Sequence, residues 1–135
     1  MSGFVLHPRL AADTALLADW DLSRVLLMND SRFAWLILVP RRAGVAELHD
    51  LGPLDRSVLV EEVARASAAL KAVTGAVKIN IGALGNVVAQ LHFHVVARNP
   101  GDAAWPGPVW GYGGPVPYGA AARDGLLARL TARLA

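Results

Sequence analysis

One helical stripe near the middle of the chain constrains the fold more than any other feature. Apolar residues recur between positions 59 and 73 at alternating spacings of four and three, so they lie on one face of a helix. The stripe consists of Leu59, Val63, Ala66, Leu70 and Val73. Pro53 suits the first turn of this helix, and Gly75 supplies the left-handed residue that ends it. The pattern predicts a helix of about five turns that buries its apolar face against another element.

Segments typical of β-strands flank this predicted helix on both sides. Short apolar or alternating runs precede it at residues 24–28 and 35–39, and follow it at residues 77–81 and 90–98. A weaker strand is predicted at residues 15–20, a run that would equally suit a short helix. The sequence therefore predicts an α+β fold, in which an antiparallel sheet of about five strands carries one long helix.

The length and composition predict a single globular domain. With 135 residues, of which 54% are hydrophobic and 18% charged, the chain can bury one core and is too apolar to be disordered. We expect one domain over residues 1–135, with a core at about residues 14–111 and a tail at 112–135. The proline-, glycine- and tryptophan-rich residues 99–119 are predicted to be irregular, whereas residues 120–135 suit a short final helix.

Composition also excludes several classes of function. The absence of cysteine excludes disulfides, thiol nucleophiles and thiolate zinc sites. A formal net charge of +2 gives no reason to expect a nucleic-acid or membrane partner. The N-terminus lacks the layout of a signal peptide, and the longest apolar run, residues 33–40, is far shorter than the roughly 18 residues of a spanning helix. We therefore expect a cytoplasmic protein.

Two histidines on the predicted strand at residues 90–98 are the main candidates for chemistry. Alternation places one set of side chains on the core face, namely Leu91, Phe93, Val95 and Ala97. The opposite face carries Gln90, His92, His94, Val96 and Arg98. Side chains two residues apart on a strand are separated by roughly 6.5 to 7 Å, which suits two imidazoles that act on one phosphate-sized group.

Three interpretations of the histidine pair remain open on spacing alone. Both imidazoles could be ordinary structural groups. As metal ligands they would need a third His, Asp or Glu, and His7 and His49 both lie in predicted loops where an exposed histidine is common. As catalysts, one imidazole would be a nucleophile and the other a proton donor or phosphate contact.

The surrounding sequence resembles the histidine triad (HIT) superfamily, whose hallmark is three histidines that alternate with apolar residues. Here the hallmark reads Gln-Leu-His-Phe-His-Val-Val over residues 90–96, and this form is similar to a bacterial subgroup in which glutamine opens the motif. Asn80 resembles the family's Asn-x-Gly element, and Gly85-Asn86-Val87 resembles its phosphate-contacting turn. The resemblance covers roughly residues 24–111.

Two further segments carry the resemblance. Trp105-Pro106 is similar to the Trp-Pro near the end of the domain in the Hint-like branch. The stretch from Trp35 to Arg42 resembles an apolar strand followed by proline and two basic residues, with Trp35 where a fourth histidine is usual. The family therefore implies a HIT-like fold, in which the sheets of two copies join in a homodimer.

The resemblance also implies a reaction and a set of roles. His92 would attack the α-phosphorus of a nucleotide and form a nucleotidyl-histidine intermediate, while His94 would contact phosphate oxygen and Gln90 would replace an orienting histidine. The family requires no metal and no other cofactor. The implied substrates are nucleoside phosphoramidates or dinucleoside polyphosphates, with purine nucleotides favoured.

The substrate contacts that the resemblance implies extend around this pair. The residues expected to bind the substrate are Asn80, Gly85, Asn86, Val87, Asn29, Asp30 and Trp105. Among them, the turn at residues 85–87 would hold phosphate oxygens, and Asn29 or Asp30 would bind the ribose hydroxyls. Leu27 and Leu36 are expected to form apolar walls around the base.

Three alternatives to this nucleotidyl-transfer enzyme remain open. Gln90 and Trp35, which stand where the family has histidines, allow a nucleotide-binding module without useful catalysis. The pair His92 and His94 allows a metal-binding protein or metal-dependent enzyme. The tail, rich in proline and aromatic residues, allows a structural interaction protein.

Overall fold

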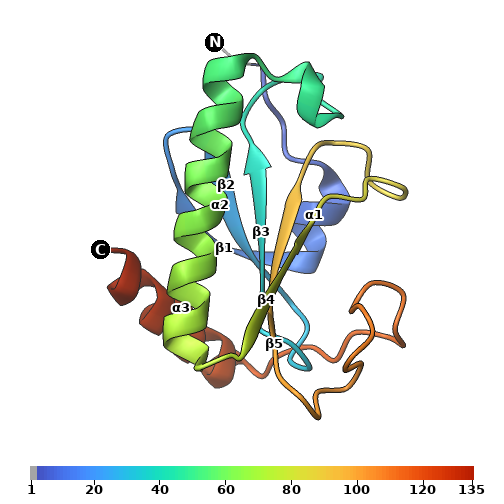
Figure 1. Cartoon of the computed structure of the whole chain (residues 1–135), viewed down its shortest axis with the longest axis vertical. Helices are drawn as coiled ribbons and strands as arrows, with labels where there is room; N and C mark the ends of the chain where they lie inside the picture. The colour runs from blue at the N-terminus through green and yellow to red at the C-terminus, as the bar shows by residue number, and fades with distance from the viewer. Residues whose placement is uncertain (1–2) are drawn as a thin grey trace.

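A computed structural model describes residues 3–135 and shows one five-stranded antiparallel sheet with helices on both faces (Figure 1). The elements in chain order are α1 Pro8–Asp13, β1 Thr14–Asp19, β2 Ser23–Met28, β3 Trp35–Pro40, the 3₁₀ helix η1 Leu48–Asp50, α2 Pro53–Thr74, β4 Lys78–Gly82, β5 Phe93–Arg98 and α3 Ala120–Leu134. The strand order is β1-β2-β3-β5-β4. The α+β prediction, including the weaker first strand, is confirmed.

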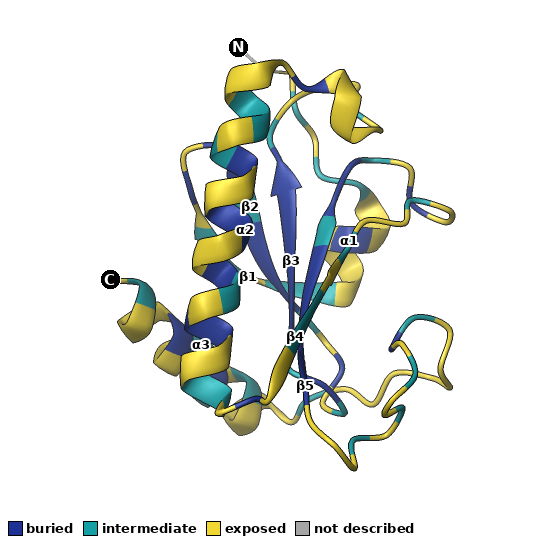
Figure 2. Cartoon of the chain, in the orientation of Figure 1, coloured by how far each residue is buried: buried dark blue, intermediate teal, exposed yellow. Residues whose placement is uncertain are grey.

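Helix α2 matches the predicted stripe. It begins at Pro53 and ends at Thr74, and Gly75 follows in the left-handed conformation at φ 69°. Four of the five stripe residues are buried, and the fifth, Val73, is half-buried against the same core. Figure 2 shows buried residues along the side of α2 that meets the sheet, and exposed residues along its outer side. The apolar face of α2 therefore covers one side of the sheet.

Strand β5 is shorter than the sequence predicts. It begins at Phe93, not at Gln90, because the pairing with neither neighbouring strand continues past this point: β3 pairs with β5 as far as Leu38↔Phe93, and β4 ends at Gly82↔His94. The Leu91 N–H instead donates to the Val45 carbonyl in the loop before η1. His92 consequently lies just before the strand, at the rim of the sheet.

The two faces of the sheet form separate apolar clusters. The cluster under α2 includes Leu27, Leu36 and Val95, whereas the cluster on the opposite face includes Trp35 and Ile37. Leu27 and Leu36, expected as walls of a base pocket, therefore face the helices. The prediction assigned them to the wrong face, because side chains alternate along a strand and Leu36 lies between Trp35 and Ile37.

The two ends of the chain add elements on different faces. Helix α3 confirms the predicted final helix and packs Leu126 and Leu130 into the cluster under α2. Helix α1, which the sequence did not predict, is too short to show a periodicity, and its Leu10 joins the opposite cluster. Residues 99–119 contain no helix or strand, as expected. In the described part of the chain, none of the helices is long and apolar enough to cross a membrane.

Candidate active site

A cavity of about 470 Å³ opens on the sheet face opposite α2, and both motif histidines line it. Its walls come from α1, from strands β2, β3 and β5, from the loop between β4 and β5, and from the irregular residues 99–119. The apolar lining includes Leu10, Met28, Ile37 and Trp110. The cavity therefore combines an apolar interior with two imidazoles at one side.

The His92 ring is held by its own chain. Its Nδ1 lies 2.7 Å from the backbone carbonyl oxygen of Gln90. A carbonyl oxygen only accepts hydrogen bonds, so this contact requires that Nδ1 carries the proton. In the neutral ring Nε2 then keeps its lone pair, which is the state a nucleophilic imidazole needs.

The His94 ring is held in the opposite tautomer. The indole Nε1–H of Trp35 donates to His94 Nδ1 at 3.0 Å, so the proton of the neutral ring lies on Nε2. Burial, together with the neighbouring His92, lowers the pKa of His94 to about 4. Its ring centre is 4.8 Å from that of His92 and 5.4 Å from that of Trp110. His94 is therefore a neutral hydrogen-bond donor at physiological pH.

The loop between β4 and β5 meets the histidines as the sequence predicts. Gly85, Asn86 and Val87 all line the cavity that contains His92 and His94. The loop turns at Gly85, whose φ of 76° disfavours any residue with a Cβ. The structure therefore brings these five predicted site residues together in one cavity.

Gln90 reaches this site through its backbone and not through its side chain. The family resemblance implies that its side chain orients the nucleophile, but the backbone carbonyl oxygen makes that contact. The side-chain amide instead binds the N-terminal segment, with Oε1 accepting from the His7 N–H and Nε2 donating to the Val5 carbonyl.

Asn80 and Trp105 lie outside the cavity, in contact with a buried arginine. Arg98 is 1% exposed, and its guanidinium donates to Asn80 Oδ1 at 2.9 Å and to both carboxylate oxygens of Asp102. The Trp105 ring lies 5.7 Å from the same guanidinium. Arg98 lowers the pKa of Asp102 to about 2. Asn80 and Trp105 therefore contact Arg98 in this arrangement, and substrate binding by these two side chains stays a prediction.

Asn29 and Asp30 also lie outside the cavity, where they attach the tail to the turn between β2 and β3. Asn29 Oδ1 accepts from the Tyr118 N–H, and the buried Asp30 accepts from Arg32 and from the Val116 N–H. Burial alone would raise the pKa of Asp30, but these hydrogen bonds outweigh it and lower the pKa. Both side chains therefore hold the tail in this arrangement, and their binding to a ribose stays a prediction.

Several lining residues have no signal in the sequence pattern. Arg9, Leu10 and Asp13 belong to α1, which is too short to predict, and Trp110 lies in the irregular stretch. Met28 and Ile37 could have been found from the alternation of β2 and β3, once the outer face of β5 was identified as the histidine face.

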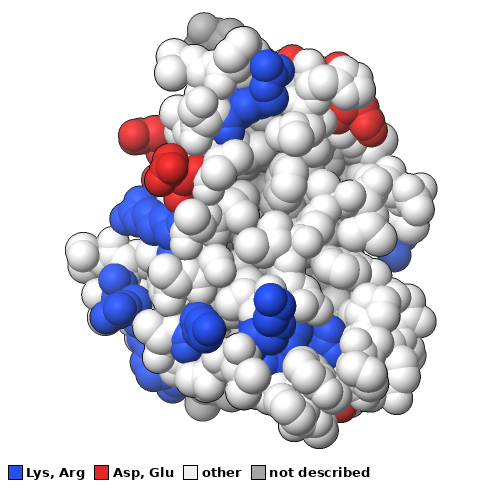
Figure 3. All heavy atoms as spheres, in the orientation of Figure 1, with Lys and Arg blue, Asp and Glu red and all other residues white. Residues whose placement is uncertain are grey.

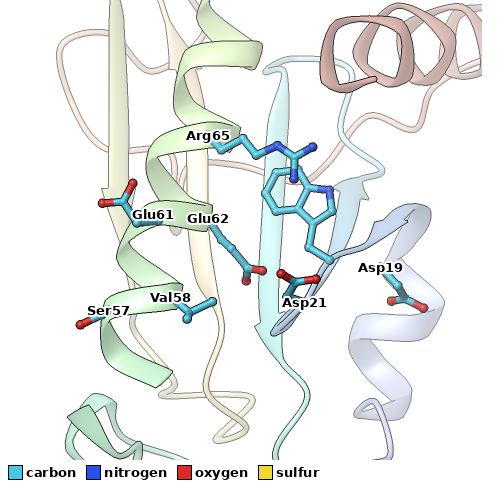
Figure 4. Close-up of a pocket in the computed structure, with 8 residues that line it drawn as sticks. Asp19, Asp21, Ser57, Val58, Glu61, Glu62 and Arg65 are labelled. Carbon is cyan, nitrogen blue, oxygen red and sulfur yellow. The ribbon is translucent and has the colours of Figure 1, made fainter. Parts of the chain in front are cut away.

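A second cavity, of about 620 Å³, lies between the β1–β2 turn and α2 (Figure 4). Its most buried carboxylate, Glu62, accepts from the N–H groups of Leu22 and Ser23, so it caps the turn. The Arg65 guanidinium lies 4.2 Å from the centre of the Trp20 ring. These polar side chains are already in contact with other groups of the protein. The histidine cavity, although smaller, contains the two imidazoles and is the better candidate for an active site.

Charge on the helix-bearing face is divided between two regions. Lys and Arg gather mainly around α3 and the neighbouring end of α2, whereas Asp and Glu lie mainly towards the other end (Figure 3). The cavity that both histidines line opens on the opposite face. In the described residues no group of three His, Cys, Asp or Glu could hold a metal ion. The third ligand that a metal site on the pair would need is therefore not supplied by residues 3–135.

Comparison with known proteins identifies the family. The model of the HIT domain family matches residues 9–101. The structure superposes on a histidine triad (HIT) protein from Sinorhizobium meliloti with a TM-score of 0.96 and 47% identity, over 98% of each chain. A histidine triad protein from Bradyrhizobium japonicum gives 0.95 and 43%, also over 98% of each chain. One from Marinobacter aquaeolei gives 0.94 and 45%, over 97% of this chain and 96% of the other.

These matches extend beyond the motif to the whole described fold. The chain therefore belongs to the HIT superfamily, whose members are generally nucleotide-binding hydrolases and transferases. A comparison with curated proteins gave no match.

Proposed function

We propose that the histidine cavity is an active site that transfers a nucleotidyl group through a covalent histidine intermediate. The observation that carries this proposal is the 2.7 Å contact from His92 Nδ1 to the Gln90 carbonyl, because it leaves the Nε2 lone pair free to attack. In the first step Nε2 bonds to the α-phosphorus, and the bond from phosphorus to the leaving group breaks with its electron pair on the leaving group. In the second step water attacks phosphorus and loses a proton to solvent, while the bond from phosphorus to Nε2 breaks with its electron pair on the imidazole, which releases a nucleoside monophosphate and restores the ring.

His94 would stabilise the charge that builds on phosphorus during both steps. Its neutral ring presents Nε2–H as a donor, because Nδ1 is occupied by Trp35. A fixed neutral donor in a buried position suits a phosphate oxygen, since it stabilises negative charge without first losing a proton. The loop at residues 85–87 would contact the remaining phosphate oxygens from the other side of the cavity.

The substrates proposed are nucleoside phosphoramidates or dinucleoside polyphosphates, with a purine base. Leu10, Met28 and Ile37 form the apolar part of the cavity and would contact the base, in place of the two leucines expected from the sequence. We also propose that two copies form a homodimer by joining their sheets and that the protein acts in the cytoplasm. An elution volume that matches one chain would contradict the dimer.

The decisive experiment is turnover of a fluorogenic adenosine phosphoramidate, with intact-mass analysis during the reaction. We expect wild-type protein to turn over and to show the mass of one added nucleotidyl group, and His92→Ala to lose at least about a thousandfold in rate. The control is Arg129→Ala, because Arg129 is exposed on α3 and lines neither of the two cavities that contain His92. Equal rates for His92→Ala and wild type would overturn the mechanism.

A second candidate is a nucleotide-binding module without turnover. Two observations favour it: the Gln90 side chain is committed to the N-terminal segment, and Trp35 occupies the place of a family histidine. Binding of adenosine monophosphate without turnover of any phosphoramidate would select this alternative.

A further inference from the structure

Residues 4–13, which we name the N-terminal arm, form one wall of the histidine cavity and are attached by the Gln90 side chain. Gln90 Oε1 accepts from the His7 N–H at 2.8 Å, and Gln90 Nε2 donates to the Val5 carbonyl at 2.9 Å. Both partners are more than 80 residues away in the sequence. The two bonds use both ends of the amide and thus tie the arm to the segment that carries His92.

The arm brings three kinds of side chain to the cavity: an apolar one, a cationic one and the carboxylate of Asp13. Leu10 is buried and lines the cavity, while Phe4 and Leu6 pack against the same apolar cluster. Arg9 also lines it and is the only Lys or Arg among the cavity-lining residues of the described chain. The arm thus contributes both an apolar surface and the cationic group of the site.

Arg9 is available to an anionic ligand. Its Nε lies 3.7 Å from the Asp13 carboxylate, and the two side chains are 62% and 47% exposed. An ion pair this open is weak, so a phosphate group can compete for the guanidinium. The imidazole of His94 supplies no positive charge at neutral pH, because its pKa is about 4.

We propose that the N-terminal arm is a substrate-binding element for nucleoside phosphates, in which Leu10 contacts the nucleoside and Arg9 binds the phosphate. Gln90 is a positioning residue, since both hydrogen bonds of its side chain go to the arm. This inference rests on the proposed function of the cavity. It also gives a physical reason for glutamine at this position: one amide side chain both accepts from and donates to the arm's backbone.

The test compares the binding of adenosine and adenosine monophosphate by calorimetry. Gln90→Met keeps the side-chain length but removes both hydrogen bonds, and we expect it to weaken both ligands by about tenfold. Arg9→Gln should weaken adenosine monophosphate by about tenfold and adenosine by less than about twofold. Arg129→Gln, an exposed arginine on α3, is the matched control and should change neither.

A kinetic readout separates positioning from general loss of structure. With phosphoramidate as substrate, Gln90→Met should raise KM by about tenfold and leave kcat within about threefold, because the backbone carbonyl still holds His92. Hydrogen exchange at residues 4–13 should become faster in this variant, while exchange in α2 remains unchanged.

The outcomes distinguish this inference from the proposed function. If wild-type protein binds adenosine monophosphate and both Gln90→Met and Arg9→Gln bind it equally well, the arm proposal is overturned and the cavity assignment stands. If wild-type protein neither binds this nucleotide nor turns over a phosphoramidate, the proposed function fails and the arm proposal fails with it.

Discussion

The two faces of the sheet differ in the polar side chains that they bury. The face under α2 is filled almost entirely by aliphatic side chains, and its buried carboxylate, Glu62, only caps a neighbouring turn. The opposite face buries His94 and Arg98, each with named partners from other segments. Burying such groups costs free energy unless they are hydrogen-bonded. The first face therefore builds the fold, while the second maintains a set of buried polar contacts on which the site depends.

The largest effect should come from breaking the buried ion pair on the site face. Arg98→Met leaves Asp102 and Asn80 without their partner, and we expect a loss of about 3 to 5 kcal/mol in the free energy of unfolding. The matched control is Arg42→Met, because Arg42 pairs with Asp55 at the surface and should cost less than about 1 kcal/mol. Urea denaturation measures both; similar losses would show that burial is not what distinguishes the two faces.

Acidification should lower the free energy of unfolding, because the buried His94 resists protonation in the folded chain. The pKa of His94 is about 4 in the folded chain and 6.5 in a free side chain. Between these values the unfolded chain binds a proton that the folded chain does not, so stability falls as the pH falls from about 6.5 to 4. The wild type should therefore lose about 3 kcal/mol more than His94→Asn between pH 7 and pH 4.

His49→Asn is the control for this pH dependence. His49 lies at the surface, so its variant should follow the wild-type curve. Parallel curves for wild type and His94→Asn would mean that His94 titrates normally in the folded chain.

The smallest effect compares the two tryptophans beside His94. Trp35 donates its indole N–H to His94, whereas the buried Trp110 Nε1 has no partner among the described residues. Trp35→Phe should cost about 1 to 2 kcal/mol and allow His94 to change tautomer, which nitrogen chemical shifts report. Trp110→Phe removes no hydrogen bond and should cost less. Equal costs would show that the bond from Trp35 contributes nothing beyond packing.

The same division explains what the sequence could predict. The α2 stripe and the strands follow from periodicity, because one continuous face is buried in each case. His92, His94 and residues 85–87 follow from two neighbouring sequence motifs, the alternating histidines at 90–96 and the turn at 85–87. Asn29 and Asn80 were assigned to the substrate, yet they bind Tyr118 and Arg98. No local pattern reports a partner so far along the chain.

The parts of the site that the sequence did not reveal come from the chain ends. Helix α1 is six residues long and Trp110 lies in a stretch without regular structure. Their positions depend on distant contacts, such as those of Gln90 with the N-terminal arm. Hydrophobic periodicity reports which face of a helix or strand is buried, so it cannot predict where helix α1 and Trp110 lie relative to the site.

The backbone contact that holds His92 bears on how this motif can change over time. Every amino acid carries a carbonyl, so any residue at position 90 that preserves the local backbone also preserves the acceptor for the nucleophile's Nδ1. A lineage can therefore exchange the first histidine of the motif without losing the orientation of the second. The side chain at that position is then open to selection for a different task.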